Sequence, residues 1–568
     1  MLIGLVFLWP LVRLLFRSFG ETANPQANFE RILATPLYTE ALLRTFGYAA
    51  LATVGSLILG YPLAYRMRVV RPGIRLVLIV LVIIPFFVAL LVRTFGWMVI
   101  LGRTGPFARL TQALTGEPLT LLYSPLAVQI GMVAILLPFM VLPIYSVMAA
   151  IDLRLLRAAR VTGASPVAAF LTIFLPLTVP GILAGVVLVF MLGIGFFITP
   201  DLLGSSQGQV FATLIVKAQS SFAGSPGFTE AMAIILLAVT IVTLLLSSRV
   251  VPLQRVWGGS VAEIPTVSEI SEDRPKTAPA RVSVGGPWQS LMEHVGWPAV
   301  RLLGRLPNRV ASLPGFLLAA IAILVLDTPI LVAIIISFGR DLFLSFPPTE
   351  LTFQWYQEFA RTSAWIDALL TSLMVGMLTA LFSLLVGGLA AIGLVRADYP
   401  GKDALVSLLI SPLIIPQVIT GIAIYYVFFP VGLVGTIPGL VFAHSLVALP
   451  IVTITLAANL RNFDVRLERA ARVLGASAFQ AFRHVTFPII LPGVIVAAFF
   501  GFLASFDELV FSLFLVGVRL RTLPIRLWED LHFQLSPMLA VVSVIEIVLV
   551  LLAVAVAGAV TRSRQPTK

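Results

Sequence analysis

Long uninterrupted apolar runs are the feature that most constrains this chain. Each run has about 20 residues, the length that an α-helix needs to cross the hydrocarbon core of a bilayer. The runs predict twelve transmembrane helices near residues 2–19, 42–65, 76–100, 125–150, 179–200, 229–248, 315–338, 369–395, 404–429, 437–459, 490–516 and 537–560. Because the runs do not alternate every second residue, a transmembrane barrel is disfavoured. The expected fold class is an all-α integral membrane protein.

The balance of apolar and charged residues agrees with this expectation. Hydrophobic residues make up 59% of the chain and charged residues 11%, against about 45–50% and about 25% in soluble domains. A water-soluble enzyme is therefore excluded, and we expect no catalytic residue. The net charge of +12 indicates the cytoplasmic loops of a membrane protein rather than a nucleic-acid partner. Since the chain has no cysteine, disulfides and thiolate metal sites are excluded, and we expect no metal site.

Arginines gather in the loops after the even-numbered spans, and loops rich in arginine stay in the cytoplasm. Both chain ends are therefore predicted to be cytoplasmic. The arginines and one lysine that support this orientation are Arg66, Arg68, Arg71, Arg75, Arg154, Arg157, Arg160, Arg249, Arg255, Arg461, Arg466, Arg469, Arg472, Arg483, Arg562, Arg564 and Lys568. Arg519, Arg521 and Arg526 lie on the predicted outside and oppose it, although Glu529 and Asp530 lie close by.

One long polar stretch, residues 251–312, divides the chain. Its centre, Ile264 to Gly286, is rich in Ser, Thr, Pro and charge, which predicts a disordered cytoplasmic linker. The segment Trp288 to Arg309 could form an amphipathic helix on the inner membrane surface. The expected domains are residues 1–250, a first transmembrane domain, and 313–568, a second one. Prolines inside the spans predict helices that are kinked rather than broken.

The two halves of the chain repeat each other. Pro10 is followed eight residues later by Ser18-Phe19, and Pro329 is followed at the same distance by Ser337-Phe338. This alignment places the start of span seven about nine residues before the position equivalent to Met1. We expect that the first span starts upstream or is short enough to thin the bilayer locally. No signal-peptide cleavage pattern ends span one, so we expect it to be retained.

The cytoplasmic loop after the fourth span of each half carries the strongest repeat. Residues Asp152 to Gly181 align without a gap onto Asp464 to Gly493. Each copy predicts a short amphipathic helix, a Gly-Ala-Ser turn, a second helix and a proline that opens the next span. A helix hairpin at any membrane interface needs small residues for packing, but that need does not explain a duplication of this length.

These loops resemble the coupling loops in the membrane subunits of type I ABC importers. The family pattern is Glu-Ala-Ala, three residues, Gly, nine residues and Ile-x-Leu-Pro. Arginine replaces the leading Glu in both copies here. The matching residues are Arg157, Ala158, Ala159, Gly163, Ile173, Leu175 and Pro176 in the first copy, and Arg469, Ala470, Ala471, Gly475, Val485, Phe487 and Pro488 in the second.

The resemblance implies the family's fold of two homologous six-helix halves and its location, the bacterial inner membrane. It also implies two docking sites for a homodimeric cytoplasmic ATPase, which would bind ATP and magnesium, and an extracytoplasmic solute-binding protein. The chain itself contains no G-x-x-x-x-G-K-[ST] pattern, so the energy must come from another polypeptide. No cofactor is therefore expected on this chain. The two arginines predict extra carboxylates in the partner's docking groove.

Further segments resemble one branch of this family in particular. The first half resembles one spermidine/putrescine permease subunit and the second half resembles its partner subunit, so the two subunits look fused. The segments that carry this likeness are residues 91–97, 137–143 and 200–204 in the first half, and 412–416, 418–421 and 505–508 in the second. The best substrate prediction is a polyamine. Fused two-half permeases also serve ferric iron and thiamine, so both remain alternatives.

Acidic residues within predicted spans are candidates for the substrate path, because ionisable groups at membrane depth are costly. Asp507 and Glu508 in span eleven, flanked by Phe506, offer carboxylates and an aromatic face for ammonium groups. Adjacent helix residues point about 100° apart, so only one is expected to line the path. A purely structural role, joining helices in the bundle, is an equal alternative for both.

Other charged and aromatic residues have weaker signals. Asp201 near the outer end of span five could receive cations, or it could be a solvated helix end. Glu546 and Asp327 lie deeper, where a helix-joining role is as plausible as a path role. Arg93 is interpreted as a structural counter-ion and His444 as a hydrogen-bonded packing residue. Aromatic walls could come from Trp97, Phe196, Phe197, Tyr425 and Tyr426.

Two classes of function remain. The first is the permease of an importer that works by alternating access, and the second is an ion-driven secondary transporter, which also shows internal repeats. The duplicated loop favours the first class, because an ion-driven transporter needs no ATPase-docking surface. A purely structural membrane scaffold is a distant third for the same reason.

Overall fold

The computed structural model describes residues 4–19, 26–220, 227–248, 308–341, 346–517, 520–533 and 536–562. Within these ranges all regular elements are helices, joined by turns and loops, and one isolated β-bridge links Gly339 and Leu351. The predicted linker centre and nearly all of the amphipathic segment from Trp288 lie outside the described residues. The domain boundaries therefore stay a prediction.

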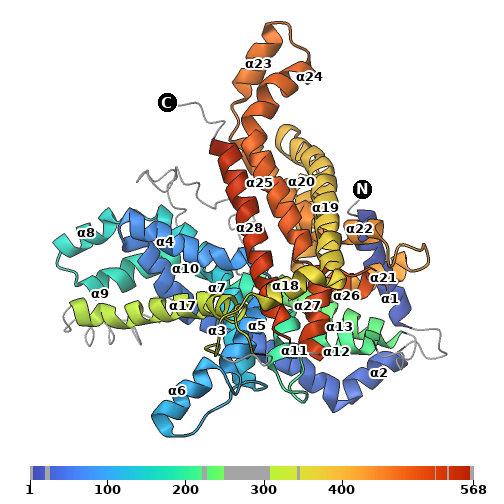
Figure 1. Cartoon of the computed structure of the whole chain (residues 1–568). Coiled ribbons are helices and arrows are strands. Elements are labelled where there is room, and N and C mark those ends of the chain that lie inside the picture. Colours follow the sequence, from blue (N-terminus) through green and yellow to red (C-terminus); the bar gives the residue numbers. More distant parts are fainter. Residues whose placement is uncertain are drawn as a thin grey trace.

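Figure 1 shows the two halves by colour along the chain. The first half consists of η1 (Gly4–Leu8), α1 (Trp9–Ser18), α2 (Ala27–Ala34), α3 (Pro36–Val69), α4 (Pro72–Ile83), η2 (Ile84–Phe87), α5 (Leu90–Leu101), α6 (Pro106–Thr115), α7 (Pro125–Ala150), α8 (Arg154–Val161), α9 (Pro166–Ala169), η3 (Phe170–Phe174), α10 (Leu175–Ile194), α11 (Ile198–Leu203), α12 (Phe211–Ser220) and α13 (Phe228–Ser248). The second half consists of α17 (Asn308–Ile336), α18 (Gln354–Arg361), α19 (Ser363–Arg396), α20 (Lys402–Ile414), α21 (Gln417–Phe428), α22 (Ile437–Arg461), α23 (Val465–Val473), α24 (Ala478–Ala481), η5 (Phe482–Thr486), α25 (Phe487–Phe506), α26 (Val510–Leu515), α27 (Leu523–Phe533) and α28 (Met538–Arg562).

The helices follow in the same order in both halves. Even individual hydrogen bonds have equivalents in the two halves. Thr45 Oγ1 accepts from the backbone N–H of Phe211 at 2.9 Å, and Ser372 Oγ accepts from that of Leu523 at 2.7 Å. These bonds tie α3 to the start of α12 and α19 to the start of α27. A π-helical turn, η3 or η5, precedes α10 and α25 alike. The repeat predicted from the sequence is therefore also a structural repeat.

The described residues contain eight helices that are long and apolar enough to cross a membrane, or up to ten if each bent pair is counted as one span. Together these account for ten of the twelve predicted spans. The first and last predicted spans correspond to α1, with 10 residues, and to α28, whose apolar segment is Met538–Leu552. The all-α membrane fold is confirmed, and the count of twelve stays a prediction.

Two predicted spans are broken rather than kinked, so that part of the prediction was wrong. The α4–η2 segment meets the helices after it at 102°, and α20 meets α21 at 100°. The first break falls at Val88 and Ala89, whose ψ angles of 126° and 143° leave the helical region. Ile84, before Pro85, stays helical.

At the second break, Pro416 directly precedes α21. Proline lacks a backbone N–H and disfavours the helical region for the residue before it. Ile415 accordingly adopts φ −72° and ψ 132°, and the helix ends there.

The first helix of each half packs against the other half. Helix α1 contacts α21 and α13, while α17 contacts α5, α28 and α3. Figure 1 shows α1 beside the second-half helices and α17 along the first-half helices. The two halves thus exchange their first helices, and each helix completes the packing of the opposite half.

Small residues let the helices of each half approach closely. A Cβ atom on Gly60 of α3 would lie 3.2 Å from side-chain atoms of Met140 and Val141 of α7, and one on Gly185 of α10 would lie 2.7 Å from Met140 Sδ. In the second half, a Cβ on Gly387 of α19 would lie 2.8 Å from Thr453 Oγ1. Because lipid removes the hydrophobic drive between helices, such close van der Waals packing is what holds them together.

The exchange contact between α5 and α17 leads to a prediction for Gly96. A Cβ at this position would overlap the carbonyl oxygen of Pro329 and lie 2.7 Å from its Cα. Overpacking of this kind costs about 1–3 kcal/mol, so we expect Gly96→Ala to lower the midpoint of thermal unfolding in detergent. The control is Gly47→Ala in α3, where a Cβ meets no atom within 4 Å. Equal midpoints for the two variants would contradict the close contact.

Candidate functional site

Each half carries a helical hairpin at the start of its long helix, built by α8 and α9 before α10 and by α23 and α24 before α25 (Figure 1). The first helix of each hairpin ends at a glycine in the left-handed region, Gly163 or Gly475, both with φ +95°. Glycine adopts this conformation without strain. The backbone N–H of Ala164 then donates to Ala159 O at 3.0 Å, and that of Ala476 donates to Ala471 O at 3.1 Å. The two turns are therefore the same C-terminal cap built twice.

The repeated loop residues divide into an exposed set and a packed set. Arg157, Ala158, Gly163, Arg469, Ala470, Gly475, Phe487 and Pro488 are exposed. Ala159, Ile173, Leu175, Pro176, Ala471 and Val485 are partly or fully buried. The packed set fixes each hairpin to its long helix, and the exposed set forms a surface that a partner protein could contact.

Asp507 and Glu508 lie in a break between α25 and α26, not inside a helix as the sequence predicts. Helix α25 ends at Phe506 and α26 begins at Val510. The Glu508 carboxylate accepts from the backbone N–H of Phe511 at 2.7 Å and so caps α26. The half-buried Asp507 accepts instead from the backbone N–H of Leu90 at the start of α5. The 100° separation expected for adjacent helix residues therefore does not apply.

Three ionisable side chains from different elements surround this break, and we call them the central charge cluster: Arg93 of α5, Asp507, and Glu546 of α28. Arg93 is 9% exposed and Glu546 is 1% exposed. Both lie within electrostatic range of Asp507. Among the described residues, neither carboxylate oxygen of Glu546 has a hydrogen-bond partner. One cation thus faces the carboxylates of Asp507 and Glu546, with the carboxylate of Glu508 next to Asp507, which leaves the cluster suited to a further positive charge.

Phe506 and His444 have packing roles in this conformation, whereas Asp327 does not. Phe506 is fully buried and stacks on Phe502 with ring centroids 5.3 Å apart. His444 Nδ1 lies 2.8 Å from Ser505 Oγ and Nε2 lies 3.1 Å from Ser512 Oγ, as expected for a hydrogen-bonded packing residue. Asp327 Oδ2 has no hydrogen-bond partner among the described residues.

Asp201 holds the two halves together at the end of the bundle opposite the hairpins, which we call the far end. One carboxylate oxygen lies 3.3 Å from Lys217 Nζ of α12, and the other lies 3.0 Å from His532 Nε2 of α27. Phe197 and Trp528 make an edge-to-face contact beside this bridge, with centroids 5.9 Å apart. Asp201, predicted as a cation receiver, is therefore already shared by two basic side chains.

Arg17 connects the exchanged helix α1 both to its own half, through an ion pair, and to the second half, through an aromatic ring. Arg17 Nε donates to Glu230 Oε1 of α13 at 3.2 Å, and the guanidinium lies 4.3 Å from the ring centroid of Tyr426 in α21. Tyr426 Oη donates to Gln219 Oε1 at 3.3 Å. Tyr426, predicted as an aromatic wall, thus binds a cation that belongs to the protein itself.

The sequence reasoning missed Lys217, Glu230 and His532. Each lies in or near the start of a helix. Lys217 pairs with the nearby Asp201, whereas Glu230 and His532 pair with residues from segments far apart in the chain. Charged residues make up only 11% of the chain. A charged residue near a predicted span is therefore rare, and this rarity could have marked all three as candidates.

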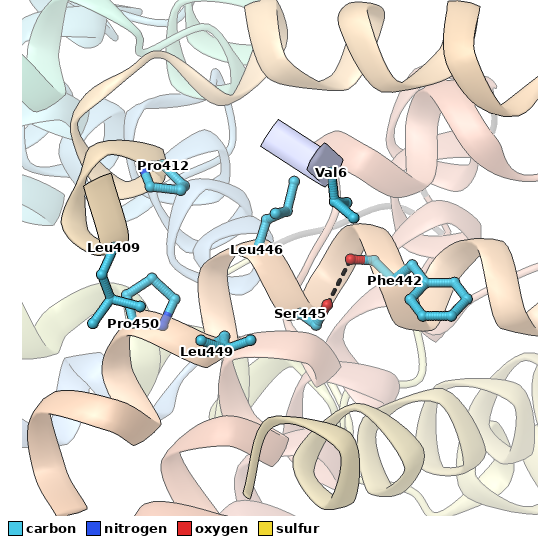
Figure 2. A pocket seen from close by; sticks show the side chains of 8 residues that line it. All are labelled: Val6, Leu409, Pro412, Phe442, Ser445, Leu446, Leu449 and Pro450. Carbon is cyan, nitrogen blue, oxygen red and sulfur yellow. Dashed lines mark hydrogen bonds between the residues drawn. The ribbon is translucent and has the colours of Figure 1, made fainter. Parts of the chain in front are cut away.

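Figure 2 shows a small pocket formed by η1, α20 and α22. Its lining contains Ser445, whose hydroxyl donates to Phe442 O at 2.6 Å, and otherwise only apolar residues. The pocket holds no ionisable group and lies apart from the central charge cluster. It is therefore not suited to a charged solute.

Comparison with known proteins identifies the type of protein that these features belong to. The family described as "Binding-protein-dependent transport system inner membrane component" matches twice, over residues 56–256 and 383–565. The spermidine/putrescine transport system permease protein PotB of Escherichia coli is 38% identical over 200 residues, covering 35% of this chain and 72% of that protein. The permease protein PotC of the same system in Haemophilus influenzae is 31% identical over 235 residues, covering 41% and 91%. PotC of Escherichia coli is 29% identical over 250 residues, covering 44% and 94%.

The far-end bridge predicts a dependence on pH. Burial lowers the pKa of His532, but hydrogen bonds to Asp201 and Trp528 O and the charge of Asp201 outweigh burial and raise it above 6.5. The bridge is therefore fully formed below about pH 6.5 and is lost as the pH rises through the raised value. Since the chain has no cysteine, spin labels at Ser206→Cys and Leu520→Cys can report the separation of the halves.

We expect this distance distribution to widen as the pH rises from about 6 to about 8.5. In the His532→Gln variant the distance distribution should be wide at both pH values. An equal pH response in His532→Gln and the parent would contradict the role of the histidine.

Proposed function

The chain belongs to the family of binding-protein-dependent transport system inner membrane components, and from that premise we propose that it supplies both membrane halves of an ATP-driven importer. Its cargo is a small cationic solute, and the substrate class that fits best is a polyamine such as putrescine or spermidine. The chain is a multi-pass membrane protein and a transport permease rather than an enzyme. A separate ATPase that binds ATP and magnesium supplies the energy.

The observation that carries this proposal is the pair of matching hairpins. Both expose an arginine on the first hairpin helix, Arg157 or Arg469, and both turn at a glycine with the same backbone angle. Two copies of one surface on one chain suit two copies of one partner, as in a homodimeric ATPase. Because both arginines are exposed, the partner groove would offer carboxylates to them.

The orientation follows from the same surface. The hairpins face the cytoplasm, where the ATPase lies, and the far end faces outward, where an extracytoplasmic solute-binding protein delivers the solute. Arginines of the hairpin helices support this side, because basic loops are retained in the cytoplasm. Both chain ends are then cytoplasmic.

Transport proceeds by alternating access between the two halves. The Asp201 bridge between α11 and α27 holds the far end closed in this conformation. Closure of the ATPase dimer moves the hairpins together, the halves rock, and the far-end contacts separate. The exchanged helices α1 and α17 make the halves move as interlocked bodies, because each contacts the opposite half.

The central charge cluster is the part of the path suited to a polyamine. Asp507 and Glu546 supply two carboxylates against the single cation of Arg93, and Glu546 has both oxygens unpaired among the described residues. An ammonium group that reaches the cluster would satisfy a buried carboxylate that is otherwise costly in lipid. The relatives named for spermidine and putrescine transport support this substrate class.

Reversal of both hairpin charges tests the docking role. We expect the double variant Arg157→Glu and Arg469→Glu to lower ATP-driven uptake at least about tenfold, because like charges would meet across the contact. Loss of ATPase co-purification should accompany the loss of uptake. Arg109→Glu, an equal reversal on α6 away from the hairpins, is the control. Wild-type uptake in the double variant would refute the docking surface.

Neutralisation of the central carboxylates tests the substrate class. Loss of a hydrogen bond to a charged group costs about 1.5–3 kcal/mol, so we expect Asp507→Asn and Glu546→Gln to weaken stimulation of ATP hydrolysis by putrescine roughly tenfold or more. Glu358→Gln is the control, because it neutralises an exposed carboxylate of α18 outside the cluster. Stimulation by anionic solutes alone, or equal responses of all three variants, would remove the polyamine assignment.

A further inference from the structure

One hairpin helix has a buried carboxylate that the other lacks. Glu468 of α23 is 9% exposed and is the single buried residue of that helix. Helix α8 of the first hairpin has no buried residue. Glu468 directly precedes Arg469, the exposed arginine of the repeated loop pattern.

Glu468 joins three elements through charge-assisted hydrogen bonds. Arg396, the last residue of α19, donates from Nη1 and Nη2 to the two carboxylate oxygens at 3.2 Å and 2.6 Å. Thr486 Oγ1, at the end of η5, donates to Glu468 Oε2 at 2.8 Å. A two-point arginine–carboxylate pair fixes orientation as well as distance. We call Arg396, Glu468 and Thr486 the hairpin clamp.

Among the described residues, the first half has no counterpart of the hairpin clamp. In the gapless alignment of the two loops, Leu156 takes the place of Glu468 and Phe174 takes the place of Thr486. The basic residue near the end of α3, Arg68, donates instead to the backbone oxygens of Met148 and Ile151 at the end of α7. Helix α8 is thus held by apolar contacts, which fix orientation less firmly than paired hydrogen bonds.

Helix α19 connects the hairpin clamp to the far end. It runs without interruption over 34 residues, and Ser372 near its other end accepts the hydrogen bond from Leu523 of α27. From Ser372 to Arg396 the helix spans about 36 Å at the usual rise per residue. Helix α27 also carries His532, which bridges to Asp201 of the first half. A displacement of α23 therefore has a continuous rigid route to the contact that closes the far end.

We propose that Arg396 and Glu468 are positioning residues that lock the second hairpin to α19, so that this hairpin, unlike the first, moves with the helix that leads to the far end as one body. The proposal rests on the proposed function for its consequence in transport. The second hairpin transmits the ATPase movement to α27 directly. The first hairpin can tilt on its apolar contacts while its helix stays in place.

The lock itself is testable without turnover, because introduced cysteines are the only ones in the chain. Spin labels at Val473→Cys and Leu385→Cys, both exposed, report the position of α23 relative to α19. Labels at the equivalent positions Val161→Cys and Ile58→Cys report the first half. We expect a narrow distance distribution for the second-half pair and a wider one for the first-half pair. Glu468→Gln and Arg396→Met should widen the former at least twofold and leave the latter unchanged.

The consequence for transport is measured in vesicles that contain the chain, its ATPase and its solute-binding protein. Glu468→Gln and Arg396→Met should lower the solute moved per ATP hydrolysed several-fold while hydrolysis continues. The exchanged pair, Arg396→Glu with Glu468→Arg, should restore much of the ratio. Arg340→Gln is the control, because it breaks an exposed ion pair of the same 2.6 Å length with Glu350 away from the hairpin.

The two measurements separate the lock from the proposed function. Unchanged second-half distances in Glu468→Gln and Arg396→Met would overturn the lock, whether or not the complex transports. Widened distances with an unchanged transport ratio would overturn its role in coupling. Absence of ATP-driven uptake in the parent complex would overturn the proposed function, and the spin-label result would still decide the lock.

Discussion

The exchange of first helices between the halves is the interaction on which the rest of the structure depends. Because α17 lies on α5 and α1 lies on α21, each half lacks part of its packing surface without the other. The contact between Gly96 and the Pro329 backbone shows how closely the exchanged helix approaches. In lipid such contacts replace the hydrophobic effect as the source of cohesion. Two halves that interlock in this way can rock against each other while staying assembled.

Few charges remain inside this assembly, and nearly all described ones have a defined task. Glu508 caps a helix, Asp201 bridges the halves, and Glu468 ties the second hairpin to α19. Glu546 differs, because its carboxylate is buried and has no hydrogen-bond partner among the described residues. In a lipid environment an uncompensated carboxylate is costly. The position of Glu546 near Asp507 and Arg93 is therefore the strongest physical reason to place the cargo there.

The sequence predicts those features that depend on local pattern. Apolar runs predicted the long helices, and the duplicated loop predicted both helical hairpins. The turns at Gly163 and Gly475 were predictable, because a turn with positive φ favours glycine.

Features that depend on contacts between distant segments were not predictable in the same way. Proline in an apolar run predicts a disturbance but not its angle, so the breaks near Pro85 and Pro416 were taken for kinks. The break after Phe506 has no proline, and it separates Asp507 and Glu508 from the helix expected around them. Partners such as His532 for Asp201, or Arg396 for Glu468, come from elements brought together only by the fold.

The central claim, that this permease is driven by ATP through its hairpins, is tested most directly by uptake into sealed vesicles. Vesicles that contain the chain, its partner ATPase and its solute-binding protein are given labelled putrescine, with either ATP or an ion gradient as the energy source. The account predicts accumulation only when ATP is present on the hairpin side, and none from a proton or sodium gradient alone. Accumulation driven by an ion gradient in vesicles without the ATPase would contradict it.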